Sequence, residues 1–138
     1  MKYMKLALEA AKEAVKEGNV PVGCAIIKNN EVLSIAYNKK NSHNISVYHA
    51  EILAIIEACN KLNTWNLEEC DMYVTLKPCA MCAGAIAESR IKNVYYLLDS
   101  NYHLNNVLLK TNYIKIDFES EYPKLISDFF VNVRNKKL

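Results

Sequence analysis

Four residues in the middle of the chain have the types and the spacing of a metal-dependent hydrolytic site. His49 and Glu51 stand two positions apart, and Cys79 and Cys82 follow about thirty residues later, three positions apart. Residues three apart on a helix lie on one face, so both sulfurs can reach one ion, and a neutral His49 imidazole adds a third ligand. Three protein ligands and one open position are typical of catalytic zinc, whereas structural zinc sites fill all four positions. Zinc lowers the pKa of a water in the open position, and Glu51 could take that proton.

Each part of this pattern has a more ordinary interpretation when it is taken alone. A C-x-x-C pair can be a redox dithiol or two buried small residues, and a single histidine is more often a core side chain than a ligand. The combination is much more specific, because a His-x-Glu opens one apolar segment and a Pro-Cys-x-x-Cys opens another. The joint pattern favours zinc.

These side chains have to be held by two buried helices with a strand between them. Residues His49 to Asn60 are apolar nearly all round, which predicts a buried helix. Asp71–Leu76 reads as a strand, and a small-residue helix is predicted to start at Lys77–Pro78 and run to Ser89, since proline suits the first turn of a helix. A helix N-terminus there would lower the pKa of the cysteine thiols.

The rest of the chain predicts one α/β domain over residues 1–138. An amphipathic helix over Tyr3–Glu17 ends at Gly18–Asn19, and strands Val22–Lys28 and Glu31–Tyr37 are joined by the turn residues Asn29–Asn30. Further strands are predicted at Asn93–Leu98 and Tyr113–Phe118, and a last helix at Tyr122–Arg134. Strands that alternate with helices favour partly parallel pairing, so we expect a mixed sheet with helices on both faces.

Composition narrows the class of protein. The 138 residues are 51% apolar and 23% charged, which is typical of a globular domain and not of a disordered chain. The net charge of +2 argues by itself against an obligate nucleic-acid binder. No apolar run could span a bilayer and no export signal opens the chain, so we expect a cytoplasmic protein. Cys24, Cys59 and Cys70 are expected to be buried or half-buried apolar residues.

The chain resembles the bacterial-type tRNA-specific adenosine deaminases of the cytidine-deaminase-like superfamily. The H-x-E…P-C-x-x-C signature belongs to the zinc nucleobase deaminases as a whole. The narrower resemblance rests on the flanking residues Val20-Pro21-Val22-Gly23, Asn38, Tyr73-Val74-Thr75-Leu76, Met81-Cys82-Ala83-Gly84-Ala85, Ser89-Arg90-Ile91 and Ser127-Asp128-Phe129-Phe130.

This resemblance implies a fold, a reaction and a set of site residues. The fold would be a three-layer α/β/α sandwich around a five-stranded mixed sheet, forming a homodimer with active sites at the subunit border. The reaction would convert adenosine to inosine at the wobble position of a tRNA anticodon. One zinc per subunit would be held by His49, Cys79 and Cys82, with Glu51 moving protons. The substrate contacts implied or proposed are Asn38 and the backbone at Ala50 for the flipped-out base, then Asp99, Phe129 and Phe130.

Two departures from that family concern the surroundings of the site. Lys77 stands where the family usually has Glu, and Ser100–Leu109 contains neither the Gly nor the Lys usual after the aligned Asp99. We expect that loop to take a different shape, because residues other than Gly resist positive φ. Phosphate contacts or ordinary solvated surface are open alternatives for the cations Lys39, Lys40, Arg134, Lys136 and Lys137.

Two other functions are compatible with the same zinc motif. One is a deaminase of a free base or nucleoside, of the cytosine or guanine type. The other is a non-catalytic RNA-binding subunit stabilised by zinc, and Glu51 argues against it because a structural site has no use for that carboxylate. The tRNA reading is favoured by Asn38, Ser89–Ile91 and the Ser127–Phe130 segment.

Overall fold

A mixed five-stranded sheet forms the centre of the molecule. The computed structural model describes residues 1–101 and 110–136. The strands lie in the order β2-β1-β3-β4-β5, with β1 antiparallel to β2 and β3, and with β3, β4 and β5 parallel. Their bounds are β1 Gly23–Lys28, β2 Glu31–Tyr37, β3 Asp71–Leu76, β4 Asn93–Leu98 and β5 Asn112–Lys115.

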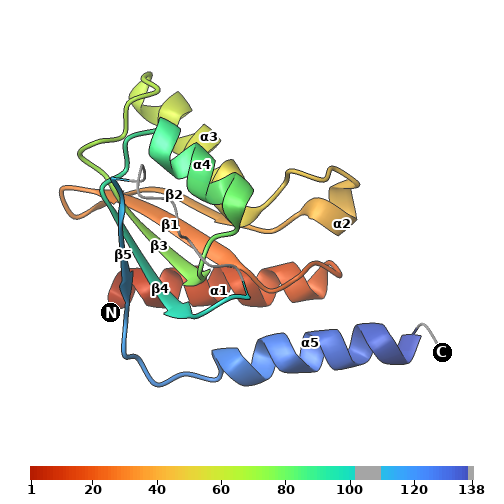
Figure 1. Ribbon diagram of the computed structural model, residues 1–138. Helices are drawn as coiled ribbons and strands as arrows, with labels where there is room; N and C mark the ends of the chain where they lie inside the picture. The colour runs from red at the N-terminus through yellow and green to blue at the C-terminus, as the bar shows by residue number, and fades with distance from the viewer. Residues whose placement is uncertain (102–109, 137–138) are drawn as a thin grey trace.

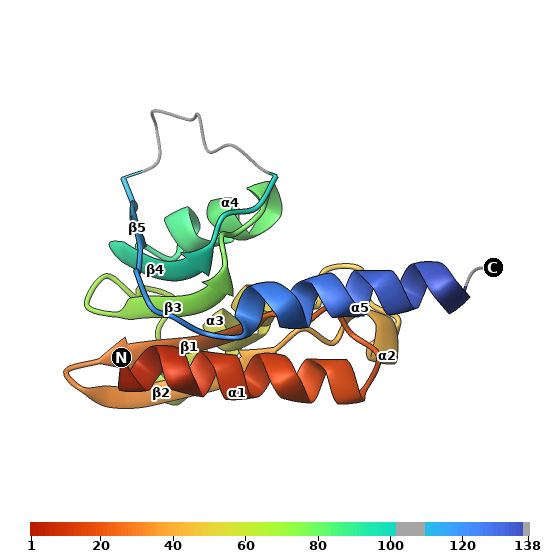
Figure 2. The same cartoon turned by 90° about the horizontal axis from the view of Figure 1, so that it is seen from below.

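Helices cover both faces of this sheet and complete the three layers. In Figure 1, α3 and α4 lie above the sheet, and α1 and α5 lie below it. The view from below shows α1 and α5 running alongside each other (Figure 2). Their bounds are α1 Lys2–Lys16, α3 Ala50–Leu62, α4 Ala80–Glu88 and α5 Tyr122–Lys136, and a single turn, α2 Lys40–His43, follows β2.

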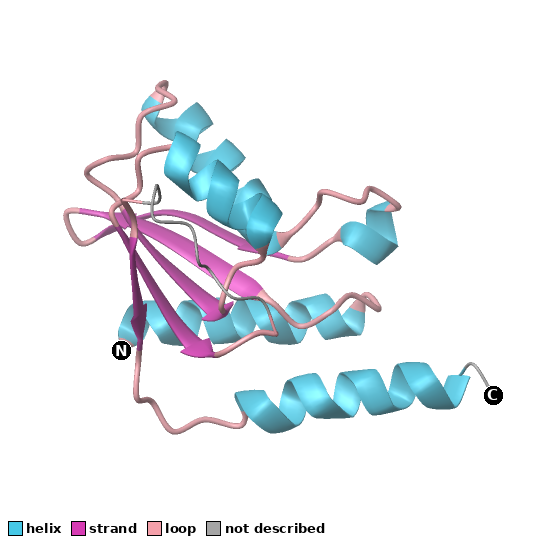
Figure 3. Cartoon of the chain, in the orientation of Figure 1, coloured by secondary structure: helices cyan, strands magenta, loops and turns pink. Residues whose placement is uncertain are grey.

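The predicted hairpin and the predicted mixed sheet are both confirmed. Asn29 and Asn30 adopt φ of 48° and 63°, the left-handed pair that a two-residue hairpin turn requires. Parallel pairing of β3 with β4 makes α4 a crossover helix, and the chain enters α4 from the carboxyl end of β3. β2 and β3 run in the same direction, so their carboxyl ends lie at one edge of the sheet (Figure 3). Asn38 directly follows β2, and Cys79 follows β3 by three residues, so both lie near this edge.

Two apolar cores fill the spaces between the layers. The larger core lies under α3 and α4 and contains residues such as Ile26, Val74 and Ile86. The smaller core lies between the sheet and the helices α1 and α5, and it includes Met4 and Tyr122. The face that α1 turns to the sheet is made of alanines (Ala7, Ala10, Ala11 and Ala14), and this small-residue face lets α1 approach β1 closely.

The structure departs from the sequence prediction at two elements and adds one short helix, while the ends of the other predicted elements agree to within two residues. The helix predicted from Lys77–Pro78 begins at Ala80, because Cys79 is extended (φ −76°, ψ 178°) and is the N-cap. The strand predicted at Tyr113–Phe118 is Asn112–Lys115, because β5 pairs only with the first four residues of β4 before the chain leaves for α5. The turn α2 was not predicted, since four residues carry no periodic signal.

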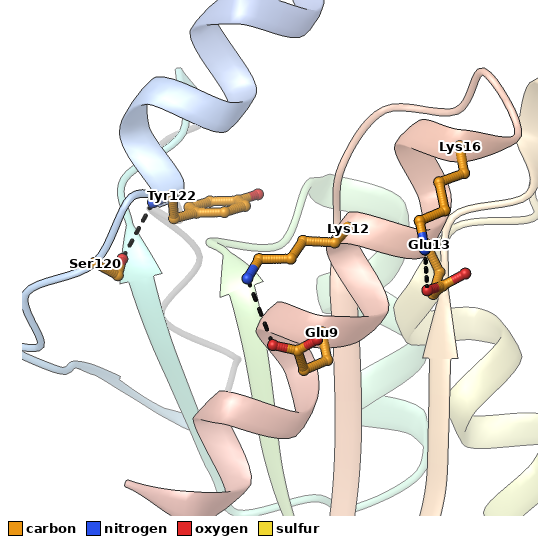
Figure 4. A network of polar contacts seen from close by, with 6 residues as sticks. All are labelled: Glu9, Lys12, Glu13, Lys16, Ser120 and Tyr122. Carbon is orange, nitrogen blue, oxygen red and sulfur yellow. Dashed lines mark hydrogen bonds and ion pairs between the residues drawn. The ribbon is translucent and has the colours of Figure 1, made fainter.

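The start of α5 is anchored to a loop far away in the sequence. The ring of Tyr122 projects from the first turn of α5 toward α1 and the sheet, while Ser120 Oγ accepts the Tyr122 backbone N–H (Figure 4). The Tyr122 hydroxyl donates a 2.6 Å hydrogen bond to the carbonyl of Pro21, and both groups are buried.

Lys12 and Lys16 pair with Glu9 and Glu13 on the exposed side of α1 (Figure 4). No helix in the described part of the chain has the length and apolar character needed to cross a membrane.

Candidate metal centre and active site

His49, Cys79 and Cys82 come together at the start of two helices. His49 is the N-cap of α3, Cys79 is the N-cap of α4, and Cys82 lies in the first turn of α4. The Nδ1 atom of His49 lies 3.7 Å from Cys79 Sγ and 3.5 Å from Cys82 Sγ, and the three donor atoms all lie within 4.8 Å of one another. The sequence prediction that these three residues converge is therefore confirmed.

The donor set and its dimensions fit a tetrahedral zinc ion. Zinc bonds of about 2.0–2.1 Å to nitrogen and about 2.3 Å to sulfur place two ligand atoms about 3.6 Å apart at a tetrahedral angle. The two observed nitrogen–sulfur separations, 3.7 and 3.5 Å, bracket that value. Two sulfurs and one imidazole are also the ligand types that zinc prefers, and three protein ligands leave a coordination position for water.

The two cysteines of this cluster differ in their affinity for a proton. Hydrogen bonds from the Cys82 thiol and from His49 lower the pKa of Cys79 to about 3. The same hydrogen bond to Cys79, with burial, raises the pKa of Cys82 well above its usual range. The hydrogen bond to Cys79 also raises the pKa of His49. These hydrogen bonds favour the thiolate form of Cys79, which is the form that binds a metal ion.

Glu51 lies in the first turn of α3 and is buried, with 4% of its surface exposed. Burial raises the pKa of its carboxyl group to about 7. A carboxylate that titrates near neutral pH can both accept and release a proton during a reaction, as a general acid/base must. Glu51 lies close enough to the cluster for the charges of His49 and Cys79 to act on its pKa, which His49 lowers and Cys79 raises.

Asn38 directly follows β2 and is also buried, with 7% of its surface exposed. Its backbone N–H donates to the carbonyl of Val22 over 3.0 Å, and its side-chain Oδ1 accepts the N–H of Lys40 over 2.9 Å. With Oδ1 engaged by the backbone, the amide Nδ2 is the group that can meet a ligand. Ala50, the first residue of α3, is fully buried beside His49.

The remaining predicted contact residues are Asp99, which follows β4, and Phe129 and Phe130 on α5. Asp99 follows β4 and is exposed, and Lys115 donates to it over 2.7 Å. Lys77 lies over the ring of Tyr96, 5.6 Å from its centroid, and helps Lys115 to lower the pKa of Asp99.

Phe129 and Phe130 lie on α5, across the sheet from α3 and α4 (Figure 1). Their rings touch each other edge to face, with 5.4 Å between centroids. Phe129 is half-buried and lines a hollow between the end of α1 and α5, whereas Phe130 is 47% exposed. Arg134 and Lys136 are exposed on the last turns of α5, and Lys137 and residues 102–109, which include His103, lie outside the described residues.

Three buried residues around the elements that form the site were given no functional role by the sequence analysis. Asn19, before β1, is fully buried and binds α2 through its side chain. Tyr113 on β5 has a buried hydroxyl with no hydrogen-bond partner among the residues that the structure describes. Cys24 is fully buried on β1, and the Glu51 charge contributes to raising the pKa of its thiol. The three cysteines outside the cluster are free and are buried or half-buried, as predicted.

Comparison with known proteins identifies the family. Residues 1–98 match the family model described as the cytidine and deoxycytidylate deaminase zinc-binding region. The chain belongs to this deaminase family. The tRNA-specific adenosine deaminase of Bacillus subtilis (strain 168) is 36% identical over 146 aligned residues, which cover 98% of this chain and 91% of the relative. Within the deaminases, the chain therefore belongs with the tRNA-specific adenosine deaminases.

Solved structures of this deaminase family have the same fold. One, from biochemical and structural studies of A-to-I editing by tRNA:A34 deaminases at the wobble position of transfer RNA, matches with a TM-score of 0.78 and 29% identity. That match covers 83% of this chain and 97% of the other. Guanine deaminase from Bacillus subtilis matches with a TM-score of 0.68 and 25% identity over 94% of this chain and 92% of the other. The predicted cytidine-deaminase-like sandwich is confirmed by these matches.

Proposed function

We propose that this protein is a zinc-dependent tRNA deaminase that converts adenosine to inosine at the wobble position of an anticodon. The observation that carries the proposal is a buried carboxylate, Glu51, beside a convergent His-Cys-Cys cluster in a chain that resembles a tRNA-specific deaminase over 98% of its length. Relatives named tRNA-specific adenosine deaminase are 36% identical (B. subtilis) and 40% identical (Aquifex aeolicus), each over more than nine tenths of this chain. These matches favour tRNA over a free base.

His49, Cys79 and Cys82 would hold one zinc ion per subunit. A zinc ion held there would act as a Lewis acid that makes water nucleophilic near neutral pH. The residues of the chain supply the rest of the chemistry. The backbone fixes two of the three ligands, because His49 and Cys79 both occupy N-cap positions, where the chain is extended and turns into a buried helix.

Glu51 is the proton carrier of the proposed reaction. It accepts a proton from the attacking water as the oxygen–carbon bond forms at the purine carbon that bears the amine, and it delivers that proton to the adjacent ring nitrogen. In a second transfer, the proton of the newly formed hydroxyl group moves to the amine, which leaves as ammonia, and the oxygen stays on the ring as the carbonyl of inosine. The carboxyl pKa of about 7 suits this exchange, because general acid/base catalysis is most efficient when the pKa of the group lies near the pH of the reaction.

Substrate contacts follow from the groups around this cluster. Asn38 Nδ2 and the backbone at Ala50 are proposed to meet the flipped-out base, and Lys39 and Lys40 to meet phosphates of the anticodon loop. Lys39 also lies over the Tyr37 ring, 5.0 Å from its centroid, at the same edge of the sheet. Asp99, Phe129 and Phe130 are proposed as further contacts with the splayed loop, whose bases can stack on exposed aromatic rings.

A homodimer is proposed from the apolar surface of the helices above the sheet. Ile56 on α3 is 50% exposed and Met81 on α4 is 37% exposed. Each subunit would be one deaminase domain, residues 1–138, working in the cytoplasm where tRNA is processed. Replacing Ile56 with Lys should shift the protein to monomer in sedimentation experiments, and an unchanged dimer would exclude this face.

The proposed reaction is tested by comparing products from different substrates. Purified, zinc-loaded protein is incubated with an anticodon stem-loop carrying a wobble adenosine, and separately with guanine, cytosine and adenosine. We expect inosine in the stem-loop and no ammonia from the free compounds. Ammonia from a free base would identify the rival deaminase. The absence of both products from protein that binds zinc and the stem-loop would indicate a non-catalytic binding subunit.

The RNA contacts are tested by the salt dependence of stem-loop binding. Replacing Lys39 and Lys40 with Gln removes two cations, and each phosphate contact with a single strand contributes about 0.7 to the slope of log affinity against log salt concentration. We therefore expect the slope to fall by about 1.4. The matched control replaces Lys12 and Lys16, which removes the same charge from the exposed side of α1. Equal effects in both variants would contradict the proposed contact.

A further inference from the structure

Asn19 is a fully buried polar residue that the proposed chemistry does not use. It follows Gly18 at the end of the α1–β1 turn, and 0% of its surface is exposed. Its Oδ1 accepts the backbone N–H groups of Asn41 and Ser42, each over 2.9 Å, and its Nδ2 donates to Ser42 Oγ over 3.0 Å. Three hydrogen bonds from one buried amide to the same short segment fix the position of that segment relative to the start of β1.

That segment is α2, which cannot hold itself. A helix of one turn is unstable in water, because fixing its backbone costs more free energy than its few internal hydrogen bonds return. Its N-cap residue, Lys39, makes no capping hydrogen bond with its side chain. The first three backbone N–H groups of α2 are satisfied instead by two asparagines: Asn38 binds Lys40, and Asn19 binds Asn41 and Ser42.

The same arrangement fixes the side chain of Asn38, the proposed contact with the base. Asn38 Oδ1 is bound to the N–H of Lys40, so the orientation of its amide depends on the position of α2. The backbone of Asn38 is tied to Val22, three residues beyond Asn19. Asn19 therefore stands between the start of β1 and the turn that orients both Asn38 and the two lysines.

We propose that Asn19 is a positioning residue for substrate binding, which acts by holding α2 in the arrangement that presents Asn38 to the base and Lys39 and Lys40 to the RNA. This inference rests on the proposed function, because it concerns the same site. Asn19 makes no contact with the reacting atoms, and the proton chemistry of Glu51 does not depend on it. Loss of Asn19 should weaken binding and leave the chemical step intact.

Steady-state kinetics on the anticodon stem-loop separate these two effects. In Asn19→Ala, we expect KM to rise about tenfold, the change that follows if the binding-competent arrangement of α2 falls to about one tenth of the population. We expect kcat within about threefold of the wild type and an unchanged zinc content, since a mutation that removes only binding leaves the chemical step alone. Asn19→Asp keeps an acceptor for both backbone N–H groups, so it should bring KM back toward the wild-type value.

A matched control distinguishes positioning from general stability. Ser34 is 2% exposed and donates a 2.9 Å hydrogen bond to the carbonyl of Ala54, away from α2. Ser34→Ala therefore also removes buried hydrogen bonding, but it should leave KM within about twofold of the wild type. If Ser34→Ala and Asn19→Ala raise KM equally, or if kcat and zinc content fall together in Asn19→Ala, the inference is overturned.

Hydrogen exchange provides a second readout that does not require activity. In Asn19→Ala, the amides of Asn41 and Ser42 should lose protection, whereas those of β1 and β3 should keep it. Protection lost across the whole sheet, or retained at Asn41 and Ser42, would contradict the inference. Failure of the proposed function looks different, because the wild-type protein would then form no inosine in the stem-loop whatever residue occupies position 19.

Discussion

Gly23, the first residue of β1, is the position at which one added methyl group should have the largest effect on stability. A Cβ atom built at Gly23 would lie 2.6 Å from the backbone nitrogen of Ala11 and 2.9 Å from the carbonyl carbon of Ala7, and closest of all to the Ala7 carbonyl oxygen. All three atoms belong to the backbone of α1, so no side chain can rotate away. The glycine is required by contact and not by its φ angle.

The size of the effect follows from these distances. Ordinary contacts of a Cβ atom begin at 3.4 Å, so the Ala11 nitrogen alone would require α1 to withdraw by about 0.8 Å, and the Ala7 oxygen would require more. Withdrawal would open the smaller core along the alanine face of α1, which is fully buried at Ala7 and Ala11. Overpacking of a rigid core costs about 1–3 kcal/mol and sometimes more, so we expect Gly23→Ala to destabilise by about 3 kcal/mol or more.

Urea denaturation followed by circular dichroism measures this change, with Gly84→Ala as the control. Gly84 lies inside α4, and a Cβ atom there meets nothing within 4 Å. Because alanine is favoured over glycine inside a helix by about 0.8–1 kcal/mol, the control should be as stable as the wild type or more stable. The same chemical change should therefore have opposite signs at the two glycines.

A loss below about 1 kcal/mol in Gly23→Ala would refute this reasoning, because it would mean that α1 does not lie against the start of β1 as described. Deamination per folded molecule provides a further check. Gly23 lies against the backbone of α1 and donates its N–H to Thr75 Oγ1 over 3.2 Å, and neither of these contacts involves a metal ligand. Activity should therefore fall only as the folded fraction falls.

Three other perturbations address the site and its frame. Glu51→Gln should retain zinc by metal analysis and lower kcat by about 10²–10⁴-fold, the usual contribution of a general acid/base, and near-wild-type turnover would mean that another group carries the proton. Dialysis against a chelator should abolish activity and lower the melting temperature, with recovery on adding zinc, because ions that bind only the folded state stabilise it; a melting curve indifferent to metal would contradict the ligand assignment. Tyr122→Phe leaves the buried Pro21 carbonyl without its donor, so it should cost about 1–3 kcal/mol in denaturation, and an unchanged midpoint would argue against that hydrogen bond.

Periodic patterns and local turn chemistry made most of the fold predictable. The strands Glu31–Tyr37, Asp71–Leu76 and Asn93–Leu98 have the predicted bounds, since each alternates or is uniformly apolar between clear turn residues. The last strand was predicted too long. The alternation of polar and apolar residues continues past Lys115 to Phe118. However, the hydrogen bonds between β4 and this segment extend only as far as Tyr96.

The metal cluster was predictable because its residue types and their spacing along the chain form a recognisable pattern. The residues that support the site form no such pattern. Asn19 binds groups 22 and 23 residues away across a whole hairpin, and its own neighbours suggest only a turn after a helix. The extended Cys79 illustrates a related difficulty. Pro78 marks the beginning of a helix to within two residues, but only the backbone angles decide which cysteine lies in the helix and which precedes it.

The hydrogen bond from Tyr122 to Pro21 joins residues 101 positions apart, and this separation orders the events of biosynthesis. Chains fold from the N-terminus as they are made, and contacts between distant residues form late. All three metal ligands and Glu51 have been synthesised by residue 82, long before Tyr122 exists. We expect a nascent chain to acquire its metal while the Pro21 carbonyl still lacks its donor. The segment before β1 that contains Pro21 and Val22 would then become rigid only when α5 docks. Val22 also accepts the backbone N–H of Asn38.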